Sequence, residues 1–443
     1  MVRKIMDKNR KNIVIIGGGF AGLQLAKDLK KSNYNVTLID KNNYHTFQPL
    51  LYQVATGGLR VDSIAYPLRK VFRGASNIRF VMDEVLEIDT LRNNVTTKNN
   101  IIPFDYLVIA TGSGVNYFKL DDSKNLMMTL KNPQDALKIR SYILQNFEQA
   151  YKTDDPAEQE VLMNIAIAGG GPTGVELAGA IAEMKKFIFP KNYPGLDVSK
   201  MRIALFEAGP KLLGPMSDGA STKSLQYLQG FGVEVYLNAA VDHYDGDHLK
   251  VSNGMEMNTK TLIWTAGVKG VFPDGLDHQD VVKGSRLVVD GYNRVKTYNH
   301  IFAVGDVALM ASEEYPKGHP MLATVAIQQA QNLAANFKYL DKDKDMTAFE
   351  YKDKGTMATI GRNRAVVDLP FWHFQGAFAW YVWIFVHIFS IVGFKNKLSA
   401  LWDWAYNFFT YDRAVQLIIN PFVRPDQASD KKNIEEESLP TRY

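Results

Sequence analysis

The sequence contains no cysteine, and this absence excludes several classes of protein. A disulfide framework, a thiolate metal site, an iron–sulfur cluster and a redox-active cysteine pair all depend on cysteine sulfur. The composition therefore permits a reducing compartment. We also predict no metal site.

Excess charge is scarce as well: the net charge is only +4 over 443 residues, which is too small to indicate a nucleic-acid partner. Basic residues gather within residues 3–11 and at Lys395 and Lys397, beside an apolar tract. Such clusters favour anionic lipid, but a solvated tail and a helix end explain them more simply. Residues 1–12 lack the apolar core of a signal peptide, so we expect cytoplasmic synthesis and retention.

A chain of this length exceeds one hydrophobic core, so two or three domains are expected. Residues 12–16 form a nearly unbroken apolar run, as in a parallel strand buried on both faces. Gly17, Gly19 and Gly22 follow with the spacing G-x-G-x-x-G, and a helical pattern continues. The first glycine makes a tight turn, the second lets the backbone approach a pyrophosphate, and the third lets the helix pack on the strand.

A second expected strand, residues 35–40, ends at Asp40. This is where the dinucleotide motif carries an acid that accepts hydrogen bonds from a ribose. A glycine motif alone is weak, but this one has its strand, its helix and its acid. A dinucleotide site is therefore favoured over a structural glycine turn.

The same pattern recurs at residues 164–184, with Gly169, Gly171 and Gly174 in the glycine positions. The next strand ends at Glu207, after a longer gap than usual. An acid here favours the free 2′-hydroxyl of NADH over the 2′-phosphate of NADPH, although Lys211 nearby would soften that preference.

Two such units predict two dinucleotides, one held permanently and one exchanging. Three further apolar runs end on small residues and fit the same two units: YLVIATG, which ends on Ala110, Thr111 and Gly112; LIWTAG, which ends on Ala266 and Gly267; and HIFAVGD, which ends on Gly305 and Asp306.

With these segments in this order, the chain resembles the two-dinucleotide-domain flavoproteins. In that superfamily the ATG and IFAxGD motifs belong to the FAD domain, and the late carboxylate binds the flavin ribitol. The resemblance gives that role to Asp306 and further FAD contacts to Ala110, Thr111, Gly112 and Gly305. By the same resemblance, Ala266 and Gly267 contact NADH.

The resemblance also implies an α/β fold with two Rossmann-like domains. An FAD domain, residues 11–115 and 285–335, is split by an inserted NADH domain, residues 116–284. Residues 336–443 are expected to form a C-terminal membrane-associated helical region with amphipathic helices.

Within this superfamily the groups that face the flavin decide the chemistry. Disulfide reductases, sulfide:quinone reductases and peroxide-reducing NADH oxidases all need cysteine, so those branches are closed. Three stretches resemble type II NADH dehydrogenases: residues 43–59, residues 325–334, which are similar to their quinone-site helix, and residues 379–418, which are similar to their membrane-binding C-terminus.

The quinone-helix pattern of that family, A-Q-x-A-x-Q, aligns with residues 323–328. Gln328 keeps the second glutamine and Ala326 the alanine, whereas Thr324 replaces the first glutamine. The resemblance implies quinone contacts for all three, with a water bridge as an alternative at the shorter Thr324. Gln328 and Gln329 are also compatible with solvent-facing or capping roles.

Residues 371–394 contain no Lys, Arg, Asp or Glu. As one helix they could cross a hydrocarbon core of ~30 Å. Trp380, Tyr381 and Trp383 lie inside the tract, however, and such residues favour the membrane interface. A transmembrane span is therefore the less favoured interpretation.

The following stretch predicts an amphipathic helix that lies in the membrane interface. The alternative is a helix that packs its aromatic face on the protein's own core. Asp403 and Asn407 lie off the apolar face, which consists of Leu398, Leu401, Trp402, Ala405, Phe408 and Phe409.

Two titratable residues are candidates for proton transfer. Glu176 follows the second glycine motif, and by resemblance it lies near the nicotinamide and the flavin, where it relays protons. The alternative is an acid that stabilises the helix N-terminus, and the sequence favours neither. For His387, hydrogen-bonded structure is favoured over proton donation.

The sequence thus predicts non-proton-pumping oxidation of NADH through tightly bound FAD, with two-electron reduction of a membrane quinone, ubiquinone or menaquinone. We expect a peripheral protein at the cytoplasmic face of the cell membrane, bound to the lipid surface; a homodimer is left open. The alternatives are a soluble NAD(P)H reductase that feeds a ferredoxin or another protein acceptor, and a flavin- and NADH-binding sensor. Neither alternative uses the aromatic C-terminus to reach a quinone.

Overall fold

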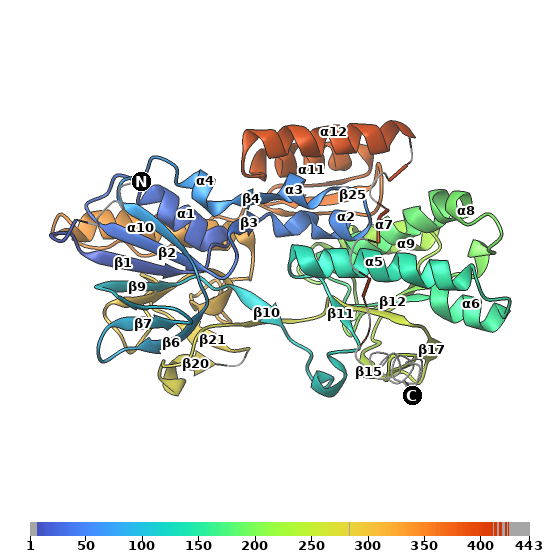
Figure 1. Ribbon diagram of the computed structural model, residues 1–443, viewed down its shortest axis with the longest axis horizontal. Helices are drawn as coiled ribbons and strands as arrows, with labels where there is room; N and C mark the ends of the chain where they lie inside the picture. The colour runs from blue at the N-terminus through green and yellow to red at the C-terminus, as the bar shows by residue number, and fades with distance from the viewer. Residues whose placement is uncertain are drawn as a thin grey trace, which may run out of the picture. The chain divides into compact units, whose positions relative to one another are not determined.

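A computed structural model describes residues 7–282, 284–410, 412–413, 416–418, 421–422 and 424. The chain forms two compact units (Figure 1). Unit 1 comprises Met1–Thr46, Ala65–Gly114 and Val268–Lys354; unit 2 comprises Phe47–Ile64, Val115–Gly267 and Gly355–Tyr443. This division is by packing. The FAD ranges 11–115 and 285–335, the NADH range 116–284 and the membrane-associated range 336–443 stay predictions.

Unit 1 is built on a five-stranded parallel sheet with β1 at its centre. Successive side chains of β1 point to opposite faces, and Ile13 and Val14 are both buried. Both faces of the sheet are therefore covered, as the apolar run predicts. The order is β22 (Ile301–Ala303), β9 (Tyr106–Ile109), β1 (Asn12–Ile16), β2 (Asn35–Asp40), β5 (Ile78–Met82).

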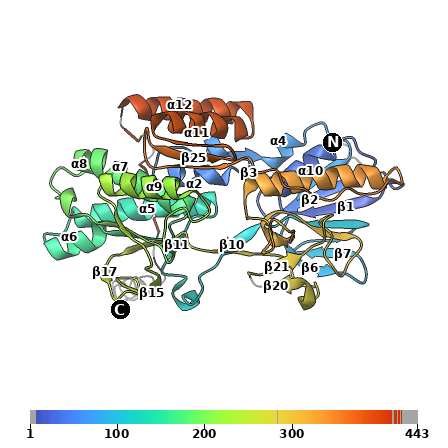
Figure 2. The same cartoon turned by 180° about the vertical axis from the view of Figure 1, so that it is seen from behind.

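Two helices, α1 (Phe20–Asp28) and α10 (Ala323–Leu340), pack side by side over this sheet (Figures 1 and 2). On the other face, Val14 shares a core with Ile88 and Val95 of a smaller antiparallel sheet. That sheet is β6 (Val85–Asp89), β7 (Asn94–Thr97) and β8 (Ile101–Pro103). The other elements are β3 (Tyr44–Thr46), β4 (Ala65–Pro67), α4 (Leu68–Val71), β19 (Val268–Gly270), β20 (Val281–Val282), β21 (Arg286–Val288) and β23 (Ala308–Leu309).

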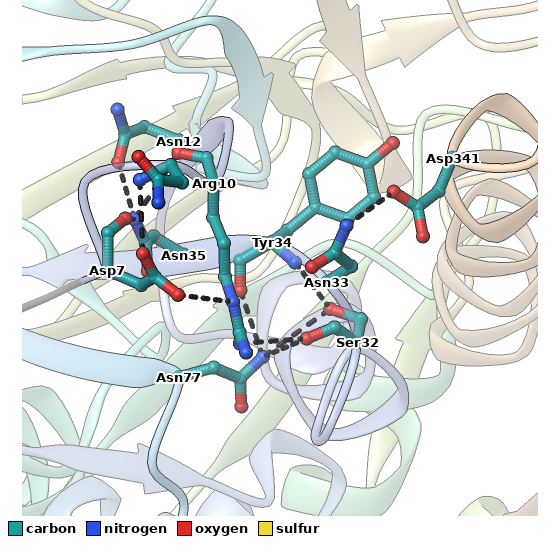
Figure 3. Close-up of polar contacts among 10 residues, drawn as sticks. Asp7, Arg10, Asn12, Ser32, Asn33, Tyr34, Asn35, Asn77 and Asp341 are labelled. Atoms are coloured by element: carbon teal, nitrogen blue, oxygen red, sulfur yellow. Dashed lines mark hydrogen bonds and ion pairs between the residues drawn. The ribbon is translucent and has the colours of Figure 1, made fainter.

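A polar cluster anchors the amino ends of strands in the parallel sheet of unit 1 (Figure 3). The Asn77 side-chain NH₂ donates to the carbonyl of Tyr34 over 3.0 Å, and the Asn35 NH₂ donates to that of Asp7 over 2.7 Å. The Tyr34 hydroxyl donates to the carbonyl of Phe337, near the end of α10, over 2.9 Å. The cluster fixes α10 against the sheet, at the opposite end from the glycine loop.

Unit 2 repeats the parallel design in the order β11 (Met128–Thr129), β18 (Thr261–Trp264), β12 (Ile165–Ala168), β13 (Ile203–Phe206), β14 (Glu234–Tyr236). An antiparallel sheet of β15 (Val241–Tyr244), β16 (His248–Val251) and β17 (Glu256–Asn258) packs beside it. Its helices are α5 (Pro133–Ala150), α6 (Pro156–Met163), α7 (Pro172–Phe187), α8 (Phe189–Asn192) and α9 (Asp218–Gly230). The second predicted strand, glycine turn and helix are therefore confirmed.

The C-terminal part of unit 2 is a three-stranded antiparallel sheet followed by two helices, α11 (Ala377–Ser390) and α12 (Phe394–Thr410). The strands are β24 (Thr356–Thr359), β25 (Ala365–Leu369) and β26 (Trp372–Gln375). The short helices α2 (Leu51–Ala55) and α3 (Val61–Ile64) belong to the same unit, and α3 packs against α12 (Figure 1).

The uncharged tract 371–394 is therefore not one helix. It is divided into β26, α11 and the first residue of α12, with breaks at Gly376 and Gly393, both at φ +92°. Among the residues that the structure describes, no helix combines the length and the apolar character of a membrane span.

Candidate functional site: two dinucleotide loops, a buried glutamate and an apolar platform

The first glycine loop leaves open space where a pyrophosphate would bind. A Cβ at Gly22 would lie 1.8 Å from the carbonyl oxygen of Gly17, so this closely packed turn requires glycine, whereas a Cβ at Gly19 would meet no atom within 4 Å. Gly19 caps α1 and makes no side-chain cap hydrogen bond. An open cradle at a helix N-terminus, where backbone N–H groups point outward, fits a phosphate.

Asp40 is tied to this loop. Its carboxylate accepts hydrogen bonds from the Gly18 N–H over 2.6 Å and the Asn42 N–H over 2.7 Å. Burial raises the pKa of Asp40, and the two backbone donors oppose that rise. The carboxylate thus holds the glycine loop at the carboxyl end of β2, where the dinucleotide motif places its acid.

The remaining predicted FAD residues follow the neighbouring strands of the same sheet. Ala110 follows β9 directly, and Thr111 and Gly112 come next. The Ser113 hydroxyl donates to Asp306 over 2.6 Å, and the N–H of Gly305 donates to the buried side chain of Gln329 over 2.7 Å.

Gln329 is a functional residue that the sequence left open. Its carbonyl oxygen fixes the turn that carries Asp306. Only its place on the sheet-facing side of α10, between Ala326 and Leu333, could have signalled this.

The second loop has the same geometry. A Cβ at Gly174 would lie 1.9 Å from the Gly169 carbonyl oxygen, whereas Gly171 has no atom within 4 Å of its Cβ position and caps α7 without a side-chain cap. Glu207 accepts hydrogen bonds from the N–H groups of Gly170 and Gly209, both over 2.6 Å. Glu207 therefore occupies the place that Asp40 has in unit 1, despite its longer gap in the sequence.

Ala266 and Gly267 follow β18 and lie beside the second loop. A Cβ at Gly169 would lie 2.7 Å from the Ala266 nitrogen. Lys211, the residue expected to soften the preference for NADH, is bonded to Asp218 over 2.8 Å.

In α10, the helix that resembles the quinone site, the two polar side chains expected to contact quinone are paired within unit 1. The Thr324 hydroxyl lies 3.0 Å from the Tyr351 hydroxyl. The Gln328 amide bonds at both ends to the backbone of Lys352, over 2.9 and 3.0 Å. Ala326 packs beside Gly305.

Glu176 is buried, with 7% of its surface exposed. It lies beyond the first turn of α7, which contains no acid, so its interpretation as an N-terminal acid is wrong. Its Oε1 instead accepts a hydrogen bond from the Thr359 N–H of β24 over 3.3 Å. Burial raises the pKa of Glu176 to about 8, against the opposing effects of Thr359 and the Trp383 side chain.

His387 is held as hydrogen-bonded structure, as the sequence favours. Its Nδ1 lies 2.8 Å from the carbonyl oxygen of Trp383, one turn earlier, and its ring stacks on the Trp383 indole with centroids 3.9 Å apart. Burial lowers the pKa of His387 to about 4.

The amphipathic helix α12 turns its apolar face outward. Leu398, Trp402 and Phe409 are 51%, 72% and 80% exposed. Helix α11 likewise exposes Phe385 and Phe389. The alternative prediction, that the aromatic face packs on the protein's own core, is therefore wrong for most of this face. We call the exposed apolar side chains of α11 and α12 the apolar platform: Phe378, Tyr381, Phe385, Val386, Phe389, Phe394, Leu398, Leu401, Trp402, Tyr406 and Phe409.

The polar side of α12 faces the protein instead. Asn407 donates to the carbonyl of Gly58 over 2.7 Å, and Asp403 accepts a hydrogen bond from Ser63 over 3.1 Å. Asn396 is buried. In a water-soluble surface helix the two sides would be reversed.

Comparison with known proteins agrees with this arrangement. Residues 11–330 match the pyridine nucleotide-disulphide oxidoreductase family, and residues 354–411 match the NDH2 C-terminal domain. The type II NADH:quinone oxidoreductase NdhA of Mycobacterium tuberculosis is 35% identical over 94% of this chain and 90% of its own length. The chain belongs to the type II NADH:quinone oxidoreductase family.

Other relatives and solved structures give the same picture. The type II NADH:quinone oxidoreductase of Staphylococcus haemolyticus is 29% identical over 82% of this chain and 90% of its own length. NDH2 from Plasmodium falciparum, solved in complex with NADH, has the same fold, with a TM-score of 0.84 at 21% identity over 93% of this chain and all of the other. The sulfide:quinone oxidoreductase of Aquifex aeolicus is less similar, with a TM-score of 0.67 at 20% identity over 98% of this chain and 96% of the other.

Family membership confirms the predicted fold and function. The fold is α/β with two Rossmann-like sheets and C-terminal helices. The enzyme is an NADH:quinone oxidoreductase, with FAD as cofactor and NADH and quinone as substrates. The relatives of Mycobacterium tuberculosis and Staphylococcus haemolyticus are named quinone oxidoreductases, so the alternatives of a ferredoxin-feeding reductase and a sensor are not supported.

Proposed function

We propose that this enzyme works as a peripheral protein on the cytoplasmic face of the membrane, with FAD held in unit 1, NADH bound in unit 2 and long-chain quinone reached from the bilayer. When bound, FAD would supply the two-electron chemistry between NADH and quinone, which side chains do not supply. The protein's part is to hold the partners and to manage protons.

The residues proposed to hold the two dinucleotides lie in the two open loops and at the ends of neighbouring strands. In each, the helix N-terminus binds the pyrophosphate and the acid binds a ribose. For FAD, within 11–115 and 285–335, these residues are Gly17, Gly19, Gly22, Asp40, Ala110, Thr111, Gly112, Gly305 and Asp306. For NADH, within 116–284, they are Gly169, Gly171, Gly174, Glu207, Ala266 and Gly267.

Glu176 is proposed to exchange a proton during turnover, because quinone takes up two protons on reduction. With a pKa of about 8, its carboxyl can gain and lose a proton near neutral pH. Quinone contacts are proposed for Thr324, Ala326 and Gln328. Since Gln328 is bonded to the Lys352 backbone, its amide has to leave these partners before it can bind quinone directly.

The observation that carries the membrane assignment is the reversed orientation of α12. An apolar side exposed to solvent, with the polar side bonded to the protein, is stable where the outer medium is lipid. The platform gives a quinone tail an apolar path from the bilayer. The homodimer stays a prediction, which light scattering of the protein in detergent would test.

Vesicle flotation tests the assignment. The variant Leu398→Ser/Trp402→Ser/Phe409→Ser removes apolar surface from the platform, and its matched control, Leu86→Ser/Leu91→Ser/Ile101→Ser, removes exposed apolar side chains of unit 1. We expect the first variant to lose vesicle binding and activity with long-chain quinone, but to keep activity with a short-chain quinone. Flotation equal to that of the control would contradict the membrane assignment.

A further inference from the structure

Close polar contacts run from Glu176 to helix α12 through residues that are far apart in the sequence. The Thr359 N–H donates to Glu176 Oε1 over 3.3 Å, and the Thr359 side chain also acts on this carboxyl, whose pKa it lowers. Thr359 Oγ1 lies 2.8 Å from the Tyr52 hydroxyl, and Gln53 Nε2 donates to the Tyr52 oxygen over 2.9 Å. Trp404 Nε1 donates to Gln53 Oε1 over 2.5 Å. All five residues belong to unit 2.

Trp404 fixes the direction of the bonds as far as the Tyr52 oxygen, because an indole N–H can only donate. Gln53 Oε1 therefore accepts, and the Gln53 NH₂ is left to donate to the Tyr52 oxygen. Either hydroxyl of the Tyr52–Thr359 pair can donate to the other, so this pair can pass a proton toward the side of Thr359 that contacts Glu176.

Within this series of contacts, Tyr52 borders a cavity of about 80 Å³. A water needs roughly 10–15 Å³ of such space, so a few waters fit. The cavity wall includes Tyr52, Gln53, Thr359, Glu183 and Arg413. These polar groups provide waters with hydrogen-bond partners, and the second lone pair of the Tyr52 oxygen can accept from one of them.

We propose that the hydroxyls of Tyr52 and Thr359 form the proton path between this cavity and Glu176. A hydronium ion in the cavity gives a proton to the Tyr52 oxygen and becomes water. The Tyr52 proton passes to Thr359 Oγ1, and the Thr359 proton passes to the ionised Glu176 carboxylate. Each hydroxyl gains and loses one proton, so only Glu176 changes its charge. The path rests on the proton exchange proposed for Glu176.

The chemistry of the path residues fits this role. Burial and the nearby Glu176 carboxylate raise the pKa of Tyr52, which therefore remains a neutral hydroxyl that accepts one proton as it donates another.

Other charged or titratable groups lie around the path. Glu183 on α7 is ion-paired with Arg413 over 3.0 Å and accepts a bond from the Arg362 N–H over 2.6 Å. On α11, burial lowers the pKa of His387 to about 4, so its ring is uncharged.

Single-hydroxyl variants of the FAD-loaded enzyme test the path. Tyr52→Phe and Thr359→Val each remove one hydroxyl, whereas Thr359→Ser keeps it. Tyr244→Phe is the matched control, because the buried Tyr244 hydroxyl of the same unit bonds to the Gly246 carbonyl over 2.8 Å and does not border the cavity. The first readout is the rate at which the protonated Glu176 carboxyl exchanges hydrogen for deuterium in D₂O, followed by its infrared carbonyl band, which Glu176→Gln identifies.

We expect exchange and turnover with a short-chain quinone to slow by about tenfold or more in Tyr52→Phe and Thr359→Val, within the range of lost acid–base assistance. Added formic acid should restore part of the turnover. Thr359→Ser and Tyr244→Phe should behave like wild type. Wild-type exchange in Tyr52→Phe would overturn the path, whereas wild-type turnover in Glu176→Gln would overturn the role of Glu176 itself.

Discussion

Replacing Glu176 by Gln should change how stability depends on pH. Glutamine keeps the shape and can still accept the bond from the Thr359 N–H, but it cannot ionise. Below about pH 4.5 the wild-type carboxyl is protonated in both the folded and the unfolded chain. Between that value and about pH 8 the folded chain keeps a proton that the unfolded chain has released, so the free energy of unfolding falls as pH rises. Above about pH 8 the loss is complete.

The size of the effect follows from the two pKa values. A rise from 4.5 to about 8 corresponds to about 5 kcal/mol, at about 1.36 kcal/mol per pH unit. Because the group is buried, little of this is screened by solvent. Glu176→Gln lacks this term, so the difference in unfolding free energy between variant and wild type should grow by about that amount from pH 4.5 to pH 8.

Urea unfolding of the FAD-loaded enzyme across this pH range measures the difference. Glu158→Gln, an exposed glutamate of α6 in the same unit, is the control and should follow the wild type at every pH. A difference in unfolding free energy between Glu176→Gln and wild type that did not change with pH would show that burial does not hold the Glu176 carboxyl protonated.

Three other substitutions give sharp expectations. Asp40→Asn removes the negative charge that accepts two backbone N–H bonds, each worth about 1.5–3 kcal/mol to a charged acceptor. FAD should therefore dissociate faster on dilution, as followed by flavin fluorescence. Unchanged retention of FAD would contradict the role of Asp40. Glu207→Gln should raise kcat/KM for NADPH relative to NADH, and an unchanged ratio would remove Glu207 from the ribose site. Glu183→Gln leaves the mostly buried Arg413 without its counter-charge and should lower the free energy of unfolding by up to about 3–5 kcal/mol, while Glu183→Gln/Arg413→Met should recover part of it. Equal stability of the single variant would show that the pair contributes nothing.

Much of the parallel framework was predictable from the sequence. The run at 12–16 is β1 and residues 35–40 are β2, because strands buried on both faces are continuously apolar. The glycine spacings are dictated by local contacts, such as the one between Gly22 and Gly17. The apolar face of α12 was likewise visible in its helical period.

Other features depend on contacts between distant parts of the chain. Tyr52 and Thr359 are 307 residues apart, and no local pattern pairs them. Adjacent glutamines on α10 look alike in sequence, yet Gln329 binds Gly305 and Gln328 binds Lys352, because they face different sides of the helix. The break of the uncharged tract at Gly393 was signalled only by the glycine itself.

Steady-state oxidation of NADH by the purified, FAD-loaded enzyme, with and without a short-chain quinone, tests the enzyme assignment. We expect rapid oxidation of NADH only when quinone is present, with one quinone reduced per NADH. Oxidation at the same rate without quinone, or none with it, would contradict the assignment of this chain as an NADH:quinone oxidoreductase.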